Sequence, residues 1–361
     1  MSNISSLYVP PAGPLDADVM LVGEAPGADE EAEGAPFVGM AGQFMERYIS
    51  RAGYPWSQVF RTNLSKNRPK GNKFVLLNDT PELEAGLKEL SEEIEKVNPN
   101  LIVSAGAWPM YYLTGLTATK GKPGTGITNW RGSIVEGSGQ FVPAMEGRKV
   151  LISYHPSYVM RPQGFGNHPV FFVDLKKIPG EAGFPEIKRP YYHSYIDPAN
   201  LILLAKEMMR SEWLTVDIET FGNSLACIGF ADSVERGLCI TYECPGGWEA
   251  AQMLLAGDQK KIFQYGAFDI NYLHHHYGWV TNGYAYDTYI AAANLMPELP
   301  KGLDFLTSIY TPFPYYKTDR KTWKQAGDQR ILWEYNIKDV IATHWVAMEQ
   351  MKELETLYEA A

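Results

Sequence analysis

Five side chains in the second half of the sequence have the types and the spacing that divalent-cation chemistry requires. Asp217 and Glu219 lie two residues apart in TVDIET, a segment typical of a β-strand, so both carboxylates are expected on one face. Asp269 follows later, and Tyr335 and Asp339 lie four residues apart on one face of a helical segment. Carboxylate oxygens are the ligands that Mg²⁺ and Mn²⁺ prefer. Four acids and a phenol predict a two-metal site for phosphodiester hydrolysis, with the phenol orienting the attacking water.

In this order the motifs resemble those of the DEDDy 3′-5′ exonucleases, a class that includes the proofreading domains of family A DNA polymerases. The resemblance covers about residues 190–361 and implies an α/β, ribonuclease H-like DEDD exonuclease fold. It implies two bound Mg²⁺ or Mn²⁺ ions, a catalytic Tyr335, and metal ligation by Asp217, Glu219, Asp269 and Asp339. An Asp-Thr pair supports the fold in this family, and Asp287 and Thr288 match it.

Two further features concern the way in which this half would contact DNA. The family's second motif usually carries Asn four residues before its Asp, and Tyr265 stands there in this sequence. We expect this departure to alter substrate contacts or rate and to leave the metal ligands intact. A basic cluster with nearby aromatic residues precedes the third motif and comprises Lys317, Arg320, Lys321, Lys324 and Arg330. Such a cluster is typical of single-strand binding, and a solvated loop is an equally good interpretation.

The first half contains a second group of residues suited to chemistry. A glycine-rich segment spans residues 23–42 and would allow a ligand to approach the backbone closely. Within it, Glu24 supplies a carboxylate and Phe37 an aromatic ring for stacking. Asn63 follows, within a stretch from 61 to 73 that contains several basic residues and no acid and is expected to contact DNA through them. His155 stands much later in HPSYVMR.

Together these motifs resemble the uracil-DNA glycosylase superfamily, most closely its iron-sulfur family, family four. The resemblance rests on GEAPG at 23–27, PFVG at 36–39, the Thr62-Asn63 pair and HPSYVMR at 155–161, and covers about residues 15–178. It implies a three-layer α/β/α fold and the excision of uracil from DNA. A uracil flipped out of the duplex needs a stacking partner and an amide that reads its edge, roles that Phe37 and Asn63 would fill.

The remaining roles concern bond cleavage and the duplex. His155 would hydrogen-bond the departing uracil, which leaves with negative charge. Glu24 would position water and stabilise a cationic sugar, and Asp29 or Glu30 is the alternative. Tyr158 and Arg161 would lie on the loop that wedges into DNA.

Two departures separate this half from its relatives. The iron-sulfur family has four cysteines, whereas this half has none: Asn67 stands where one cysteine would lie, and Gly86 or a neighbour where the next would. We therefore expect no iron-sulfur cluster. Relatives that trap uracil covalently carry a histidine in the loop after the Thr-Asn pair. Residues 64–80 contain no histidine, so turnover is expected.

The elements that position these residues are those of an α/β fold. In the first half, short apolar runs at 18–22, 101–104 and 150–153 predict parallel strands. Between the first two lies a helix over 81–97, with Thr80 as N-cap and a stripe of apolar residues three and four apart. Parallel sheets bind ligands at the carboxyl ends of their strands, so the residues that follow each strand are expected to converge.

The second half shows a similar alternation. An amphipathic stretch at 198–210 precedes a strand at 213–218, and helical patterns run from 331 to 358. The segment from 178 to 190 is rich in proline, glycine and charge and lacks apolar periodicity. We predict a uracil-DNA glycosylase-like domain over 1–178, a linker over 179–189 and an exonuclease domain over 190–361.

Composition excludes several other classes of protein. With 361 residues, 45% of them hydrophobic, the chain is long enough for two domains. It has no long apolar run and no signal-peptide pattern at its start, and its three cysteines give no metal or disulfide framework, so a cytoplasmic enzyme is expected and no membrane partner. The net charge of −10 divides into 17 basic and 19 acidic residues before residue 185 and 15 basic and 23 acidic after it.

These observations predict a bifunctional DNA-processing enzyme that excises uracil and digests DNA from 3′ ends. The arrangement resembles the front end of some bacteriophage DNA polymerases, which suggests a phage source and a bacterial host cytoplasm. Two alternatives stay open. In one, the glycosylase-like half is a non-catalytic reader of DNA. In the other, the chain is a proofreading subunit of a separately encoded polymerase. A modified pyrimidine could also replace uracil as substrate.

Overall fold

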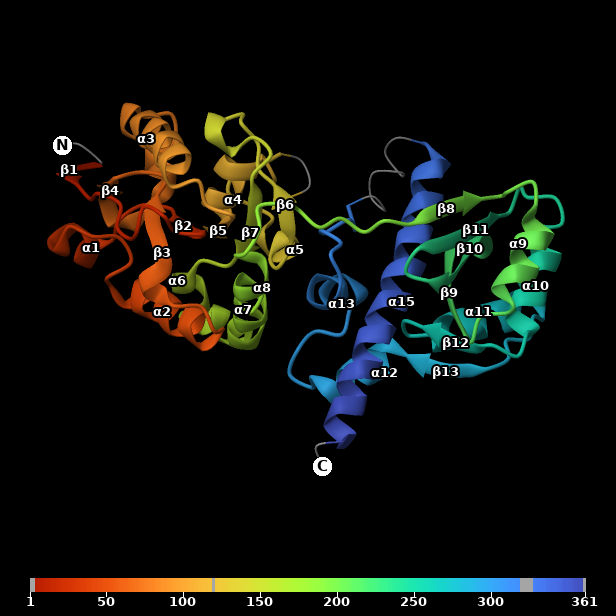
Figure 1. Ribbon diagram of the computed structural model, residues 1–361. Helices are drawn as coiled ribbons and strands as arrows, with labels where there is room; N and C mark the ends of the chain where they lie inside the picture. Colours follow the sequence, from red (N-terminus) through yellow and green to blue (C-terminus); the bar gives the residue numbers. More distant parts are fainter. Residues whose placement is uncertain (1–3, 119–120, 319–326, 360–361) are drawn as a thin grey trace. The chain divides into compact units, whose positions relative to one another are not determined.

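The computed structural model describes residues 4–118, 121–318 and 327–359, and Figure 1 shows the course of the chain. The chain divides into two compact units, Met1–Lys188 and Arg189–Ala361. The division lies at the end of the segment predicted to be a linker. The beginning of that segment packs on the first unit, because the buried Lys149 binds the Glu181 backbone oxygen at 2.8 Å and its carboxylate at 3.1 Å.

The first unit is built around a five-stranded sheet of order β3-β2-β5-β7-β6, in which β6 alone among the described strands is antiparallel to its neighbour. A separate pair joins β1 to β4. The strands are β1 (Ile4–Tyr8), β2 (Val19–Gly23), β3 (Val59–Asn63), β4 (Asn67–Pro69), β5 (Leu101–Ala105), β6 (Ile134–Glu136) and β7 (Lys149–Ser153). The helices are α1 (Ala28–Glu33), α2 (Met40–Arg51), α3 (Pro81–Val97), α4 (Ala107–Thr114), α5 (Ile127–Trp130), α6 (Pro156–Val159), α7 (His168–Leu175) and α8 (Ile178–Glu181).

The central strands of this sheet are buried on both faces, as their unbroken apolar runs require. Residues of β2, β5 and β7 that point to one face pack with α3 and α4 in a single core, and α7 packs on β7 from the other face. Helix α3 begins where predicted, since the Thr80 side chain accepts a hydrogen bond from the Leu83 amide. The result is the α/β/α fold predicted for this half.

The second unit has a six-stranded mixed sheet of order β13-β12-β9-β10-β11-β8. Its strands are β8 (His193–Ile196), β9 (Trp213–Phe221), β10 (Ser224–Ser233), β11 (Arg236–Thr241), β12 (Lys260–Phe263) and β13 (Tyr284–Asp287). Its helices are α9 (Leu201–Met208), α10 (Gly247–Ala256), α11 (Ala267–Tyr277), α12 (Thr288–Leu295), α13 (Leu303–Tyr310) and α15 (Gln329–Glu359). This is the ribonuclease H-like α/β fold that the sequence predicted.

The alternation of β9 decides where its acids point. Leu214, Val216 and Ile218 face the core formed with α9 and α10. Asp217 and Glu219 therefore face the opposite side, where α15 packs. A described glycine of β10, Gly229, pairs with Asp217, and a Cβ there would collide with the Asn336 side chain of α15. The glycine thus allows α15 to approach the strand that carries the acids.

None of the described helices combines the length and the apolar character that a bilayer crossing would require.

Candidate active sites

A cavity of about 330 Å³ opens at the carboxyl ends of β2, β3 and β7 in the first unit. Five of the six residues predicted for this half line it, namely Glu24, Phe37, Asn63, His155 and Arg161. Each follows or ends a parallel strand or lies in the loop beyond it, so the topology brings together residues that are far apart in sequence.

The sixth residue, Tyr158, lies outside the cavity lining. It sits in α6 with 37% of its surface exposed, and its ring contacts that of Tyr154 at 5.2 Å between centroids. Arg161, two residues beyond α6, reaches the cavity. The predicted wedge segment is thus at the mouth of the site, with one residue directed to solvent and one to the cavity.

Gly106, at the start of α4, separates Glu24 from His155. A Cβ on this glycine would lie 3.0 Å from Glu24 Oε1 and 3.1 Å from His155 Cβ, and its φ of +114° is in the region that side chains rarely adopt. The missing side chain lets the carboxylate and the imidazole approach the same point from two strands.

The hydrogen bonds of His155 define its tautomer. Its Nδ1 accepts from the Ser157 amide at 3.2 Å and lies 2.7 Å from Ser157 Oγ. Because a backbone amide can only donate, the neutral ring carries its proton on Nε2. Burial and, to a smaller extent, the positive charge of Arg161 lower the pKa of His155 to about 4. His155 is therefore a neutral hydrogen-bond donor near pH 7.

Burial has the opposite effect on Glu24. It raises the pKa of this carboxyl to about 7, while the positive charge of Arg161 acts to lower it. The alternative acids have other surroundings: Glu30 accepts hydrogen bonds from the Gly27 and Gly39 amides, both at 3.0 Å, and Asp29 is exposed. Glu30 thus clamps the glycine-rich loop, and Glu24 is the acid whose pKa is tuned near neutrality.

Phe37 and Asn63 converge above Gly23. A Cβ at Gly23 would lie 2.8 Å from Phe37 Cζ and would collide with Asn63 Oδ1. Phe37 is buried and has a φ of +60°, an uncommon backbone state for an aromatic residue. Strained residues of this kind cluster at functional sites. The ring and the amide are consequently held side by side in the cavity.

The basic stretch from 61 to 73 was expected to contact DNA, and the structure corrects this expectation for its central residue. Lys66 is 2% exposed; its Nζ lies 2.8 Å from Glu93 Oε1 and 3.0 Å from the Asn63 backbone oxygen. Arg68 pairs with Glu31 at 3.3 Å. The charge pattern alone was misleading because Glu93 comes from α3, a distant segment. Lys66 therefore holds the backbone of Asn63 in place through its hydrogen bond to the Asn63 oxygen.

Asn67 and Gly86, which stand where the iron-sulfur family was expected to carry cysteines, have other functions here. The Asn67 side chain donates to the backbone oxygens of Ser5 and Leu7 and so fastens β1. Gly86 packs so closely that a Cβ would lie 3.0 Å from Ser65 Cα and would collide with the Leu64 carbonyl. Neither offers a thiolate, and residues 1–188 contain no cysteine. This donor set does not fit an iron-sulfur cluster.

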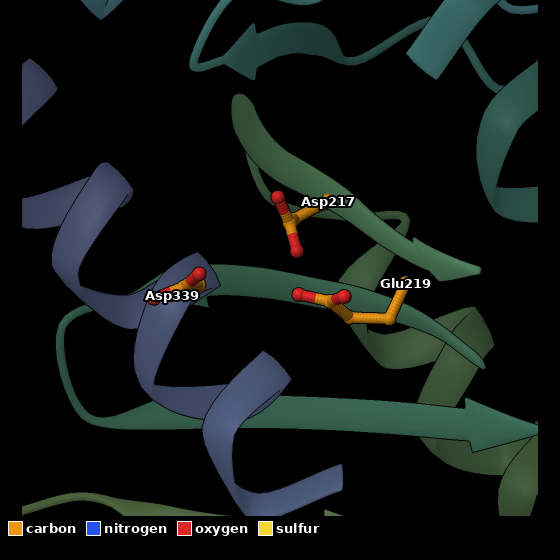
Figure 2. Close-up of side chains that lie close together, drawn as sticks. All are labelled: Asp217, Glu219 and Asp339. Atoms are coloured by element: carbon orange, nitrogen blue, oxygen red, sulfur yellow. The ribbon is translucent and has the colours of Figure 1, made fainter. Parts of the chain in front are cut away.

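The second unit brings three predicted metal ligands together, as Figure 2 shows. Asp217 and Glu219 of β9 and Asp339 of α15 each offer an oxygen within 4.8 Å of the others. Burial and the surrounding acids Asp339, Asp269 and Glu219 raise the pKa of Asp217 well above its ordinary value. A hard cation would relieve this repulsion, and the all-oxygen donor set fits Mg²⁺ or Mn²⁺.

Asp269 lies next to this group and is not among the three. Its Oδ1 accepts a hydrogen bond from the Ile218 amide at 3.1 Å, so Asp269 binds β9 at the residue between Asp217 and Glu219. Burial raises its pKa to about 7 despite backbone hydrogen bonds that favour the charged form.

The turn before Asp269 depends on Asp287, whose carboxylate accepts hydrogen bonds from the Tyr265 and Gly266 amides at 3.0 and 2.8 Å. Tyr265, 58% exposed with a φ of +61°, projects where the family has Asn.

Tyr335 is buried beside the acids, and its hydroxyl accepts a hydrogen bond from Lys317 at 2.8 Å. Lys317 Nζ also lies 2.7 Å from both carboxylate oxygens of Asp339. From the sequence, contact with a single strand and a solvated loop were equally good interpretations of this lysine. Of the rest of that cluster, Arg330 pairs with Glu334 at 3.2 Å, and Arg320, Lys321 and Lys324 lie outside the described residues.

Two further contacts were not predicted. Asn336 Nδ2 donates to Asp217 Oδ2 at 2.8 Å, and Tyr316 donates to Asp339 Oδ1 at 2.7 Å. Asn336 follows Tyr335 directly in the third motif, and this adjacency is the one sequence signal that could have indicated it.

The two units match different protein families. The family model "Uracil DNA glycosylase superfamily" matches residues 10–174, and the model "3'-5' exonuclease" matches residues 208–355. A Type-4 uracil-DNA glycosylase of Thermotoga maritima is 32% identical over 167 residues, which are 46% of this chain and 78% of that protein.

Two other similarities involve the second unit. A DNA polymerase of Bacillus phage SP01 is 24% identical over 218 residues, which are 58% of this chain and 21% of the polymerase. Neither unit is that long, so the match includes residues of both. The structure of Escherichia coli RNase D, an exoribonuclease involved in structured RNA processing, aligns with a TM-score of 0.39 and 20% identity over 46% of this chain and 45% of that one.

Proposed function

Because this chain belongs to the uracil DNA glycosylase superfamily through its first unit and carries a 3′-5′ exonuclease domain in its second, we propose that it is a bifunctional DNA-processing enzyme. The first unit excises uracil by hydrolysis of the N-glycosidic bond. The second removes nucleotides from 3′ ends by phosphodiester hydrolysis.

The observation that supports uracil excision most directly is the cavity that unites Glu24, Phe37, Asn63 and His155. A flipped uracil stacks on Phe37, and the Asn63 amide reads its N3–H and O4. As the C1′–N1 bond breaks, its electrons pass to the base, and the neutral His155 Nε2–H donates to the oxygen that gains charge. The Glu24 carboxylate stabilises the cationic sugar and positions the water whose oxygen forms the new bond to C1′.

This proposal is tested with a uracil-containing oligonucleotide in EDTA, followed by alkali to break abasic sites. Strand cleavage at the uracil is expected, since the chemistry of the first unit uses no metal ligand. The same assay with hydroxymethyluracil and other lesions defines the base. If no lesion gives alkali-labile sites, the first unit is a non-catalytic reader of DNA.

For the exonuclease, Asp217, Glu219 and Asp339 would hold the divalent cation, with Asp269 adjacent. A bound Mg²⁺ or Mn²⁺ would lower the pKa of water and offset negative charge on the phosphate oxygens. The Tyr335 hydroxyl orients the attacking water, and Asn336 and Tyr316 hold the acids in position. The joint approach of three acids from β9 and α15 supports this function best.

Replacing Asp217 with Ala should abolish digestion of a 5′-labelled single strand in Mg²⁺, a loss of at least about 10³-fold given the removal of a metal ligand. Uracil excision by the same variant should be unchanged, and this second readout shows that the variant is folded. Retained digestion would refute the assigned site.

The similarity to a phage DNA polymerase favours one further role. In it the chain acts with a separately encoded polymerase and removes misincorporated 3′ nucleotides. Co-purification of a polymerase with the tagged chain would support this association, and its absence would favour an independent enzyme.

A further inference from the structure

The ammonium group of Lys317 binds Asp339, one of the proposed metal ligands, although two-metal hydrolysis does not require a lysine there. Its Nζ lies 2.7 Å from each oxygen of Asp339 and 2.8 Å from the Tyr335 hydroxyl oxygen. The Lys317 side chain is 21% exposed and that of Asp339 is 7% exposed. The group is thus a cation bound to the Asp339 side of the cluster.

A divalent cation and this ammonium group cannot both bind Asp339 in the same way. With Tyr316 already donating to Oδ1, the ammonium group leaves neither oxygen of Asp339 free of a donor. Two positive charges a few ångströms apart also repel strongly in partly buried surroundings. A divalent cation that binds Asp339 through both oxygens must therefore displace Lys317, and one that binds through Oδ2 alone would lie beside its positive charge.

We propose that Lys317 is an exchangeable counter-ion of this site: it holds Asp339 and Tyr335 in place before the metal binds, and gives up Asp339 to the incoming divalent cation. This rests on the exonuclease function proposed above. Once displaced, the ammonium group stays tethered beside the site, where the scissile phosphate supplies a negative charge to receive it. Lys317 is thus a positioning residue whose removal makes the site easier to load.

The test is Mn²⁺ binding to metal-free full-length protein without DNA, measured by calorimetry and by the electron paramagnetic resonance signal of free Mn²⁺. Lys317→Met removes the charge and keeps an unbranched side chain that is one atom shorter. We expect it to bind Mn²⁺ about tenfold more tightly than the natural protein, a typical coupling between competing ligands. The rise in thermal stability on adding Mn²⁺ should be larger as well.

Lys338→Met is the matched control, because Lys338 precedes Asp339 in sequence and its Nζ lies 5.9 Å from the Tyr316 ring centroid, close to the 5.3 Å of Lys317. It should change Mn²⁺ affinity less than twofold, which separates direct competition from a general change in charge. Asp217→Asn should weaken binding and so identify the site being measured. If Lys317→Met is misfolded by circular dichroism, Lys317→Gln replaces it.

Unchanged or weaker Mn²⁺ binding in Lys317→Met would overturn the proposal, because a lysine with a purely structural role gives that result. The outcome is independent of catalysis. Tighter binding in a protein that digests no DNA would leave the counter-ion intact and refute the exonuclease function. Normal DNA digestion by the natural protein, with Mn²⁺ affinity unchanged in Lys317→Met, would support the exonuclease function and refute the counter-ion role.

Discussion

Glu24 and His155 face one cavity, yet burial moves their ionisation in ways that suit different tasks. The carboxyl of Glu24 has its pKa raised to about 7, so it is partly ionised at neutral pH. The imidazole of His155 has its pKa lowered to about 4, so it stays neutral from pH 5 upward. Pairs of groups whose pKa values are moved by their surroundings are typical of catalytic sites.

The pH dependence of uracil excision should follow Glu24 alone. Because the carboxylate is the active form, kcat/KM should rise with pH and level off above a midpoint near 7, with no change from His155 above about pH 5. Replacing Arg161 with Met removes a charge that lowers the pKa of Glu24, so the midpoint should move upward. Excision rates between pH 5 and 9 give the profile. A flat profile in the natural protein would exclude Glu24 as the titrating group.

The sequence could indicate Glu24 and His155 because each follows a predicted strand whose carboxyl end lies at the same edge of a sheet. Phe37 and Asn63 were indicated by the glycosylase-like motifs, and β3, which ends at Asn63, was not predicted. The sequence could not indicate their protonation. The tautomer of His155 depends on the Ser157 amide, and the role of Lys66 depends on Glu93. Lys317 shows the same limit: its type left DNA contact and a solvated loop open, whereas its position beside Asp339 depends on how α15 packs.

Among the secondary elements, α3 and β4 contain the two positions, Gly86 and Asn67, at which the iron-sulfur family was expected to carry cysteines. Gly86 touches the Leu64 backbone, and Asn67 holds β1 through two carbonyls. Direct packing thus connects α3 to the loop after β3, and hydrogen bonds connect β4 to β1, without a metal cluster between them.

Gly86→Ala tests this contact. Alanine in a helix normally stabilises by about 0.5 to 1 kcal/mol relative to glycine. Here the new methyl would collide with the Leu64 carbonyl, so we expect a net destabilisation of about 1–3 kcal/mol. Gly180 of α8 has open space around its Cβ position, and Gly180→Ala is the matched control that should show no loss. Thermal unfolding of the full chain measures both; equal melting temperatures would disprove the close contact.

The elements with a strong apolar pattern were predictable, including the short buried strands β2, β5 and β7, and the edge strands were not. The helix from 81 to 97 has the bounds expected from its cap and its apolar stripe, and β9 contains the expected strand. By contrast β1 has no buried residue in its five, and β6 has three residues at a sheet edge. Periodicity gives no signal in such strands, because pairing with β4 or β7 determines them.

For the molecule as a whole, the excess of acidic residues lies mainly in the second half of the chain, which also contains the proposed metal site. The second unit gathers four buried or half-buried acids that repel one another in the absence of metal. The first unit has no comparable group among its described residues.

Mn²⁺ should therefore raise the unfolding temperature of the second unit and leave that of the first unchanged. At a hundred times its dissociation constant, a ligand stabilises the folded state by about 2.7 kcal/mol, or roughly 5–10 °C for a domain of this size. Scanning calorimetry of the full chain with and without Mn²⁺ resolves the two transitions, and Asp217→Asn should reduce the shift. Equal shifts in both transitions would contradict this assignment.

The burial of Lys66 has a consequence for how the first unit would search DNA. A chain slides along a duplex and stays on it through ammonium and guanidinium groups that replace counter-ions on phosphates. Lys66 and Arg68 bind Glu93 and Glu31 instead, which leaves Lys70 and Lys73 as the exposed lysines of this stretch. Residence on undamaged DNA should consequently be brief. An enzyme of this kind would sample many sites by dissociating and rebinding, and would pause only where a base enters the cavity beside Phe37.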